Sequence, residues 1–435
     1  MVKPAGVVAA TDRQGLAGSL RTALLLTGLA GTCALGAQNV TTPTAETYKK
    51  RVLEAAELQV LTSYYQQDGT NAAVTGGTGT EQLTDVHPTV ILALPLNEDD
   101  VLTASIGVSA YSSASSSNVD PFDGGGEPNA FQASSGASGS DVWVNGTVTY
   151  AHSSDDRNQI LSGNLSFSNE YDYRSVGIGG SYTRLFNERN TELTVHGSAY
   201  LDNWKLVYPI ELRSRDNLLS ATGRNSYNLG LNLTQLLSRR AQGMLSVDLV
   251  QQQGLLSTPF HRIYFGDVPD RVINPPDLFL LADDIERLPD TRSKLALGGR
   301  LHYYLNELLV VRTFYRYYTD DWGVNSHTAN LEVPVKLGTY FSLRPGYRYY
   351  TQTAADYFAG FNEHLSTQVF YTSDYDLSAF DAQQYSLGVS YLDILADRNV
   401  LGWGLKSVDV NYSLYRRNNG FRAGQFAVGL KVIRR

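Results

Sequence analysis

The sequence has little of what a helical membrane protein or a thiol-dependent protein needs. Only one of its 435 residues is a cysteine, only 18% are charged, and no apolar run after residue 37 is long enough for a membrane-spanning helix. The single cysteine, Cys33, provides neither an internal disulfide nor a cysteine metal site. Aromatic residues make up 11% of the chain, which argues against disorder. With 39 Gly and 28 Tyr, the composition favours a mainly β fold.

The first residues have the pattern of a secretory signal peptide. Three basic residues precede an apolar segment at 22–36, and small residues lie just before Gln38. We therefore expect residues 1–37 to be a cleaved signal peptide, and residues 38–55 to be a periplasmic N-terminal leader. The formal net charge of -8 disfavours a nucleic-acid partner.

Beyond residue 55, apolar and polar residues alternate in segments of about ten residues. Leu229, Leu231 and Leu233, for example, are interleaved with small or polar residues, and Phe426 and Val428 repeat the pattern near the C-terminus. A period of two is typical of strands with one apolar and one polar face. A soluble β-sandwich would show the same alternation, so the connections between strands must decide.

Short polar turns, such as 97–100 and 187–190, alternate with mostly longer excursions, such as 112–140 and 255–292. This rhythm predicts an all-β protein over residues 56–435, a transmembrane antiparallel β-barrel of about 16 strands with long extracellular loops and short periplasmic turns. Segment 365–372 is assigned to a loop, since another strand would make the count odd. We expect the strands at 56–66, 86–96, 101–111, 141–152, 158–168, 172–186, 190–204, 218–236, 242–254, 293–305, 308–320, 326–337, 340–353, 383–395, 401–415 and 421–433.

Such a barrel is expected in the outer membrane of a Gram-negative bacterium, after cleavage of the signal peptide. Its expected partners are outer-membrane lipid, lipopolysaccharide and the outer-membrane assembly machinery. The sequence does not fix the oligomeric state.

Five motifs in the second half resemble a known bacterial family. They are STPFHR at 257–262, LPDTR at 288–292, YRYYTDDWG at 315–323, YRYYTQ at 347–352 and YTSDYDLS at 371–378. In this order they resemble the family called domain of unknown function 3570, over roughly residues 56–435. The resemblance implies an outer-membrane β-barrel whose biochemical role is not established. It assigns no functional residue.

Charged residues recur on the strand face that the alternation turns toward the barrel interior. A basic wall beside carboxylates would bias which ions or polar solutes enter a water-filled pore. Alternatively, these side chains pair with their neighbours and only hold a large lumen together. The candidate pore-lining residues are Arg300, His302, Arg312, Arg316, Glu332, Lys336, Arg344, Arg348, Asp248 and Asp409.

Loop 255–292 is the candidate constriction. Its apolar centre, Leu278 to Leu281, is costly to leave in water and is followed by Asp283, Asp284 and Glu286. If the loop folds inward, the three carboxylates approach the interior arginines and form an eyelet that selects by charge. In the alternative, the apolar centre caps the loop cluster from outside.

Acidic residues also gather in the expected extracellular loops. Oxygen-rich clusters suit Ca²⁺ or Mg²⁺, and the candidate metal residues are Asp374, Asp376 and Asp381. A solvated acidic rim is the preferred interpretation, so no cofactor is predicted apart from such a loop-bound Ca²⁺ or Mg²⁺.

The chain has none of the common hydrolase or nucleotide-binding motifs, so no catalytic residue is assigned and no enzyme is expected. His261 lies near Ser257 and Asp267, but triads are assembled in space, and a packed rim loop is the preferred explanation. The sequence predicts a porin-like channel or transporter for small polar or charged solutes. The alternatives are a non-channel barrel acting as receptor or structural partner of a periplasmic or surface system, and an outer-membrane enzyme.

Overall fold

The computed structural model describes residues 50–112, 141–273, 279–393, 399–400 and 402–434. The expected signal peptide, most of the leader and most of loop 112–140 lie outside these residues. Residues 50–435 form one unit, whose secondary structure is almost entirely strand. The strands are β1 (Glu57–Asp68), β2 (Leu83–Pro95), β3 (Asp100–Tyr111), β4 (Asp141–Ser153), β5 (Gln159–Asn169), β6 (Tyr173–Phe186), β7 (Thr191–Lys205), β8 (Ala221–Ser238), β9 (Ala241–Gly254), β10 (Arg262–Ile263), β11 (Val272–Ile273), β12 (Phe279–Leu280), β13 (Asp284–Ile285), β14 (Thr291–Tyr304), β15 (Val310–Asp320), β16 (Asn325–Glu332), β17 (Val335–Lys336), β18 (Phe341–Gln352), β19 (Phe380–Leu392), β20 (Asn399–Val400), β21 (Trp403–Arg417) and β22 (Arg422–Arg434).

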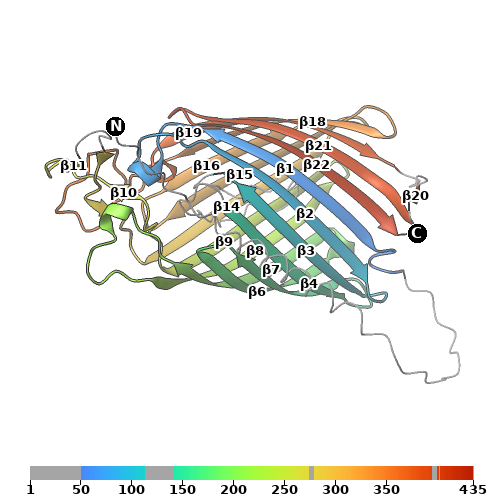
Figure 1. The fold of residues 1–435 in the computed structure, drawn as a ribbon. Coiled ribbons are helices and arrows are strands. Elements are labelled where there is room, and N and C mark those ends of the chain that lie inside the picture. Colours follow the sequence, from blue (N-terminus) through green and yellow to red (C-terminus); the bar gives the residue numbers. More distant parts are fainter. Residues whose placement is uncertain (1–49, 113–140, 274–278, 394–398, 401, 435) are drawn as a thin grey trace, which may run out of the picture. The chain divides into compact units, whose positions relative to one another are not determined.

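The long strands form one closed antiparallel barrel (Figure 1). Each pairs with the next along the chain, and β1 closes the sheet by pairing with β22, from Glu57 opposite Ile433 to Asp68 opposite Arg422. Of the 18 strands in this sheet, β17 continues β16 beyond Pro334, and β20 only pairs with the start of β21, so 16 strands form the wall. The predicted fold class is confirmed.

The two ends of the barrel differ in the length of the connections between their strands. At one end every described turn is short, and asparagine side chains shape several of them. The Oδ1 atom of Asn97 accepts hydrogen bonds from the backbone N–H groups of Asp99 and Asp100, and Asn306 binds Leu308 in the same way. Such side-chain acceptors replace backbone partners and fix a tight turn.

Among the connections that the structure describes, the opposite end carries the long loops 69–82, 206–220, 255–290 and 353–379, together with three short ones. Figure 1 shows β10 and β11 at this end and β20 at the other. Three short 3₁₀ turns lie in the long loops, η2 (Ala73–Thr75), η4 (Ile210–Leu212) and η5 (Tyr375–Leu377), while η3 (Asn187–Arg189) forms a short turn. Within the described residues, no helix has the length and apolar character to cross a membrane.

The apolar face of the sheet is its outer face. Leu165 and Leu245 are 62% and 63% exposed, whereas Ser246 and Asp248, which alternate with Leu245 on the same strand, are almost completely buried. A soluble barrel would show the reverse, because water would then contact the outer surface. An apolar exterior around a polar interior is the arrangement of a membrane-spanning barrel.

Candidate functional site

Strand register places all ten candidate pore-lining residues on the inward face. Leu297, Leu301 and Tyr303 are exposed on the outer face of β14, so Arg300 and His302 between them point inward. The direction of the side chains on the other strands follows from the pairing of neighbouring strands and from the same alternation. The inward residues are Asp248 on β9, Arg300 and His302 on β14, Arg312 and Arg316 on β15, Glu332 on β16, Lys336 on β17, Arg344 and Arg348 on β18 and Asp409 on β21.

Part of the basic wall is neutralised by neighbouring carboxylates. Arg312 Nη1 lies 2.8 Å from Glu332 Oε1, and Arg344 Nη2 lies 3.2 Å from Asp409 Oδ1. These two pairs agree with the pairing interpretation of the interior charges. The buried Nε atoms of Arg312 and Arg316 both have no hydrogen-bond partner among the described residues.

A polar cavity of about 310 Å³ lies on the inward face near the short-turn end. It is built by four consecutive strands, β7, β8, β9 and β14, and carries charges of both signs. Glu192 supplies a carboxylate, while Arg300 and His302 supply a guanidinium and an imidazole. Thr194, Asn232, Thr234 and Gln242 complete its polar lining. The cavity suits a small hydrophilic solute better than an apolar one.

At the other end four long loops within the described residues pack together into what we call the loop cap, residues 69–82, 206–220, 255–273, 279–290 and 353–379. Ion pairs and buried apolar residues join the loops. Arg262 binds Glu211 at 2.7 Å, and Arg215 binds Asp284 at 2.7 Å. Leu212, Tyr264 and Ala282 form a buried cluster, against which Leu280 and Ile285 pack. Although burial alone would raise it, the pKa of Glu211 is lowered by Arg262.

The loop cap crosses the mouth of the barrel. Loop 69–82 joins the first and second strands of the wall, and loop 255–290 joins the ninth and tenth, so the two loops arise from opposite sides of a 16-stranded barrel. They nevertheless meet, because Arg262 Nη1 donates to the Val74 carbonyl at 3.0 Å. At Gly76, with a φ of 76°, a Cβ atom would lie 2.6 Å from the Tyr264 ring, so only glycine permits this approach.

The three candidate constriction carboxylates bind within the loop cap. Asp283 Oδ2 accepts from the Phe265 backbone N–H, and Asp284 contacts Arg215 and Tyr371. Glu286 contacts Thr258, His261 and Thr372. Among the described contacts, none of these carboxylates pairs with an interior arginine as the eyelet hypothesis requires. Leu280, from the apolar centre, packs inside the cap against the cluster of Leu212, Tyr264 and Ala282.

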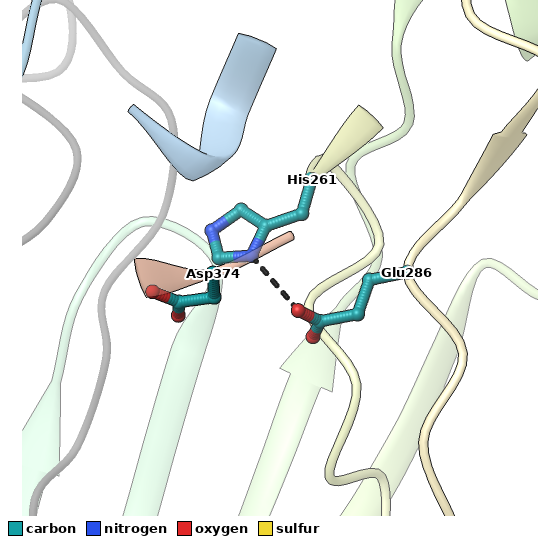
Figure 2. A group of neighbouring side chains, drawn as sticks. All are labelled: His261, Glu286 and Asp374. Carbon is teal, nitrogen blue, oxygen red and sulfur yellow. Dashed lines mark hydrogen bonds and ion pairs between the residues drawn. The ribbon is translucent and has the colours of Figure 1, made fainter. Parts of the chain in front are cut away.

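His261 and Glu286 form a buried cluster with Asp374, shown in Figure 2. Each residue offers a ligand atom, and these three atoms lie within 4.8 Å of one another. His261 precedes β10, Glu286 follows β13 and Asp374 caps η5 by accepting from the Asp376 backbone N–H. In Figure 2 the imidazole lies above, with the Asp374 carboxylate to its lower left and that of Glu286 to its lower right.

Burial and charge act together on this cluster. Burial alone favours a neutral imidazole, but the Glu286 carboxylate, 3.2 Å from Nδ1, raises the pKa of His261. Burial, and then the charge of Asp376, raises the pKa of Asp374. Two other groups that the sequence placed beside His261 are engaged elsewhere, since Ser257 Oγ accepts from the Leu288 backbone N–H and Asp267 accepts from Ser366.

The candidate metal residues separate in the structure. Only Asp374 joins the cluster with His261, whereas Asp376 pairs with Arg417 at 2.6 Å and Asp381 accepts from Tyr349 at 3.0 Å. Sequence reasoning missed the partnership of His261 with Glu286 and Asp374, because these residues are far apart in the chain and carry no spacing motif.

Several solved structures are similar to this chain at low sequence identity and low TM-score. A structure described as a bacterial polysaccharide outer membrane secretin is 12% identical, with a TM-score of 0.43, 88% of this chain and 98% of that chain covered. A TodX monoaromatic hydrocarbon channel mutant is 10% identical, with a TM-score of 0.40 and coverage of 88% and 91%. A BenF-like porin from Pseudomonas fluorescens Pf-5 is 10% identical, with a TM-score of 0.38 and coverage of 88% and 99%. Likeness of this degree carries no inference about what this chain transports or binds.

No curated protein matches the sequence. A family model does, over residues 25–421, which include nearly the whole barrel and all five sequence motifs. The chain therefore belongs to the family described as protein of unknown function DUF3570.

Proposed function

We propose that the protein is an outer-membrane channel for small polar or charged solutes, whose mouth is gated by the loop cap. The observation that supports this most is the polar cavity inside the barrel, where Glu192 faces the same space as Arg300 and His302. A 16-stranded barrel encloses a lumen wide enough for water unless side chains or loops fill it. Charges of both signs in that lumen would bias the passage of ions.

The loop cap gives the channel a closed state. Loops from opposite walls meet through Arg262 and Val74, so the contacts that hold the cap must break before a large solute enters. In this proposal the barrel lies in the outer membrane of a Gram-negative bacterium, surrounded by lipid and lipopolysaccharide and inserted by the outer-membrane assembly machinery. The channel requires no catalytic step.

A second function is favoured by one feature of the loop cap. Phe361, Leu365 and Val369 expose apolar side chains on loop 353–379, and Val369 is 65% exposed. Apolar side chains that protrude from a surface loop are suited to binding another molecule. The barrel would then act as a receptor or structural partner at the cell surface.

Reconstitution into planar bilayers distinguishes the two functions. The channel proposal expects stepwise ion currents from the purified protein, and larger currents from a variant with a disrupted cap. If both proteins are electrically silent, and liposomes containing them show no solute-driven swelling, the channel proposal is wrong and the receptor role takes its place.

A further inference from the structure

The buried cluster in the loop cap has the composition of a metal site. We propose that His261, Glu286 and Asp374 bind one divalent first-row transition-metal ion, of which Zn²⁺ is the representative, and that this ion locks loop 255–290 to loop 353–379. The inference is independent of whether the barrel conducts.

The donor set favours this class of ion. One imidazole nitrogen and two carboxylate oxygens suit Zn²⁺, Mn²⁺ or Fe²⁺, whereas Ca²⁺ and Mg²⁺ prefer sites made of oxygen alone. Ligand atoms that each lie about 2.1 Å from an ion are at most about 4.2 Å apart. The observed separations, all within 4.8 Å, therefore need only a small side-chain movement. Three protein ligands leave room for water to complete the coordination.

The burial of the cluster and its excess of carboxylates also favour a bound cation. The His261 side chain is 6% exposed and that of Glu286 is 3% exposed. The Nδ1 atom of His261 faces the cluster and lies 3.2 Å from Glu286 Oε2, so the ring nitrogen that would bind the ion is already directed at a carboxylate ligand. No Lys or Arg in the described part of the chain forms an ion pair with Glu286 or Asp374. A bound cation would replace the proton on His261 Nδ1 and balance the charge of the two carboxylates.

The surrounding groups already hold the carboxylates in place. Glu286 Oε1 accepts from the Thr258 backbone N–H at 2.6 Å, and its Oε2 accepts from Thr372 Oγ1 at 2.6 Å. Asp374 Oδ1 accepts from the Asp376 backbone N–H at 2.9 Å. Hydrogen bonds of this kind orient metal ligands and reduce the entropy that binding must overcome.

The location gives the ion a structural role. His261 and Glu286 belong to the loop between β9 and β14, and Asp374 belongs to the loop between β18 and β19. An ion shared by them would cross-link two loops that meet over the barrel mouth. Metal binding is therefore expected to slow local opening of the cap.

Calorimetric titration of the folded full-length barrel, stripped of metal with a chelator, tests the site. We expect one Zn²⁺ per chain, with Mn²⁺ binding more weakly and Ca²⁺ not competing. Glu286→Gln and Asp374→Asn should each weaken Zn²⁺ binding at least about tenfold. Both changes keep the shape of the native side chain and one acceptor oxygen, so they are expected to fold. Asp267→Asn is the matched control. It makes the same Asp-to-Asn change as Asp374→Asn and lies in the same loop as Glu286, but outside the cluster.

A second readout reports on the loops themselves. Zn²⁺ should slow proteinase K cleavage within 255–290 in the native protein and in Asp267→Asn, but not in the two cluster variants. Heat-modifiable mobility on a gel shows whether each variant retains the barrel. The proposal is overturned if the native protein binds no Zn²⁺, if Ca²⁺ binds more tightly than Zn²⁺, or if folded cluster variants bind Zn²⁺ like the native chain.

Discussion

Arg262 Nη1 donates a hydrogen bond to the carbonyl oxygen of Val74 at 3.0 Å, while Nε of the same guanidinium lies 2.7 Å from Glu211 Oε1. One side chain therefore joins three of the four loops that form the cap. Arg262 and Val74 lie in loops that arise from opposite sides of the barrel, so the strength of these contacts determines how readily the mouth opens.

Arg262→Ala should loosen the cap without unfolding the barrel. Removing one partner of a buried ion pair leaves the other charge uncompensated and costs about 3–5 kcal/mol. Glu211, whose side chain is 4% exposed, would be left in that state. Faster proteinase K cleavage of the loops and a larger single-channel conductance are expected. Arg287→Ala is the control, because Arg287 is 55% exposed and lies 3.5 Å from Asp284, and equal effects of the two changes would contradict the assignment.

Ion selectivity should respond to the charges of the interior cavity. Arg300→Ala removes a positive charge and should shift selectivity toward cations, whereas Glu192→Gln should shift it toward anions. A unit charge a few ångströms away in water is worth about 1 kcal/mol, which corresponds to a permeability ratio changed by up to about fivefold. Reversal potentials in a salt gradient measure this. Leu301→Ala on the outer face should leave them unchanged, and identical shifts for all three variants would exclude the cavity from the ion path.

Two adjacent residues of β7 test the inside-out arrangement. Val195 is exposed on the outer face, while Thr194 lines the interior cavity. Val195→Arg should destabilise the barrel by about 2 kcal/mol, since a charge facing lipid is unfavourable, whereas Thr194→Arg should have a much smaller effect. Urea unfolding in lipid vesicles gives both values. A larger loss for Thr194→Arg would show that the faces are reversed.

Glu170 should make stability depend on pH. It is buried in the turn after β5, and its Oε1 has no hydrogen-bond partner among the described residues. Burial, and then the charge of Asp172, raises the pKa of Glu170 to about 7. The pKa in the unfolded chain is about 4.3, so between about pH 4.3 and 7 the folded protein binds the extra proton. The free energy of unfolding therefore falls as pH rises through this window, by up to about 4 kcal/mol.

Glu170→Gln removes that pH dependence. The variant should be more stable than the native protein at pH 8 and nearly equal to it at pH 4, as measured by urea unfolding. Glu188→Gln in the exposed turn between β6 and β7 should show no such difference. Parallel stability curves for native protein and Glu170→Gln would show that the carboxyl group is hydrated rather than buried.

Single-cysteine labelling tests which end of the barrel faces the outside. The only cysteine of the sequence, Cys33, lies in the expected signal peptide, so introduced cysteines stand alone in the barrel. A membrane-impermeant maleimide should label Thr367→Cys in the loop cap of intact cells. Arg239→Cys, in the turn between β8 and β9, should be labelled only after lysis. The opposite pattern would invert the topology.

The strands could be predicted from the sequence because their signal is local. Alternation with a period of two depends on which face of each strand meets lipid. When β17 is counted as the end of β16, no bound of the 16 predicted strands differs from the structure by more than three residues. The inward direction of Arg300 follows from the same parity. This direction can be assigned without knowing which residues, distant in the sequence, lie nearby in the fold.

The loop contacts could not be predicted, because they depend on closure of the barrel. Glu286 meets Thr372, 86 residues away, and Arg262 meets Val74, 188 residues away, only after the wall brings their loops together. The eyelet hypothesis considered only the cations of the interior. It missed Arg215 and Arg271, which lie in the loops themselves and reach Asp284 and Asp283 first.

The pairing of β1 with β22 has a consequence for biogenesis. The first strand pairs with the last, so this seam between β1 and β22 joins residues with the greatest sequence separation in the barrel. Such non-local pairing forms slowly. Until then β1 and β21 expose unpaired edges that attract other strands. A nascent chain that stops before Arg422 has no partner for β1 and should be captured by periplasmic proteases. Only a chain that has been synthesised to its last strand can therefore close the barrel and escape degradation.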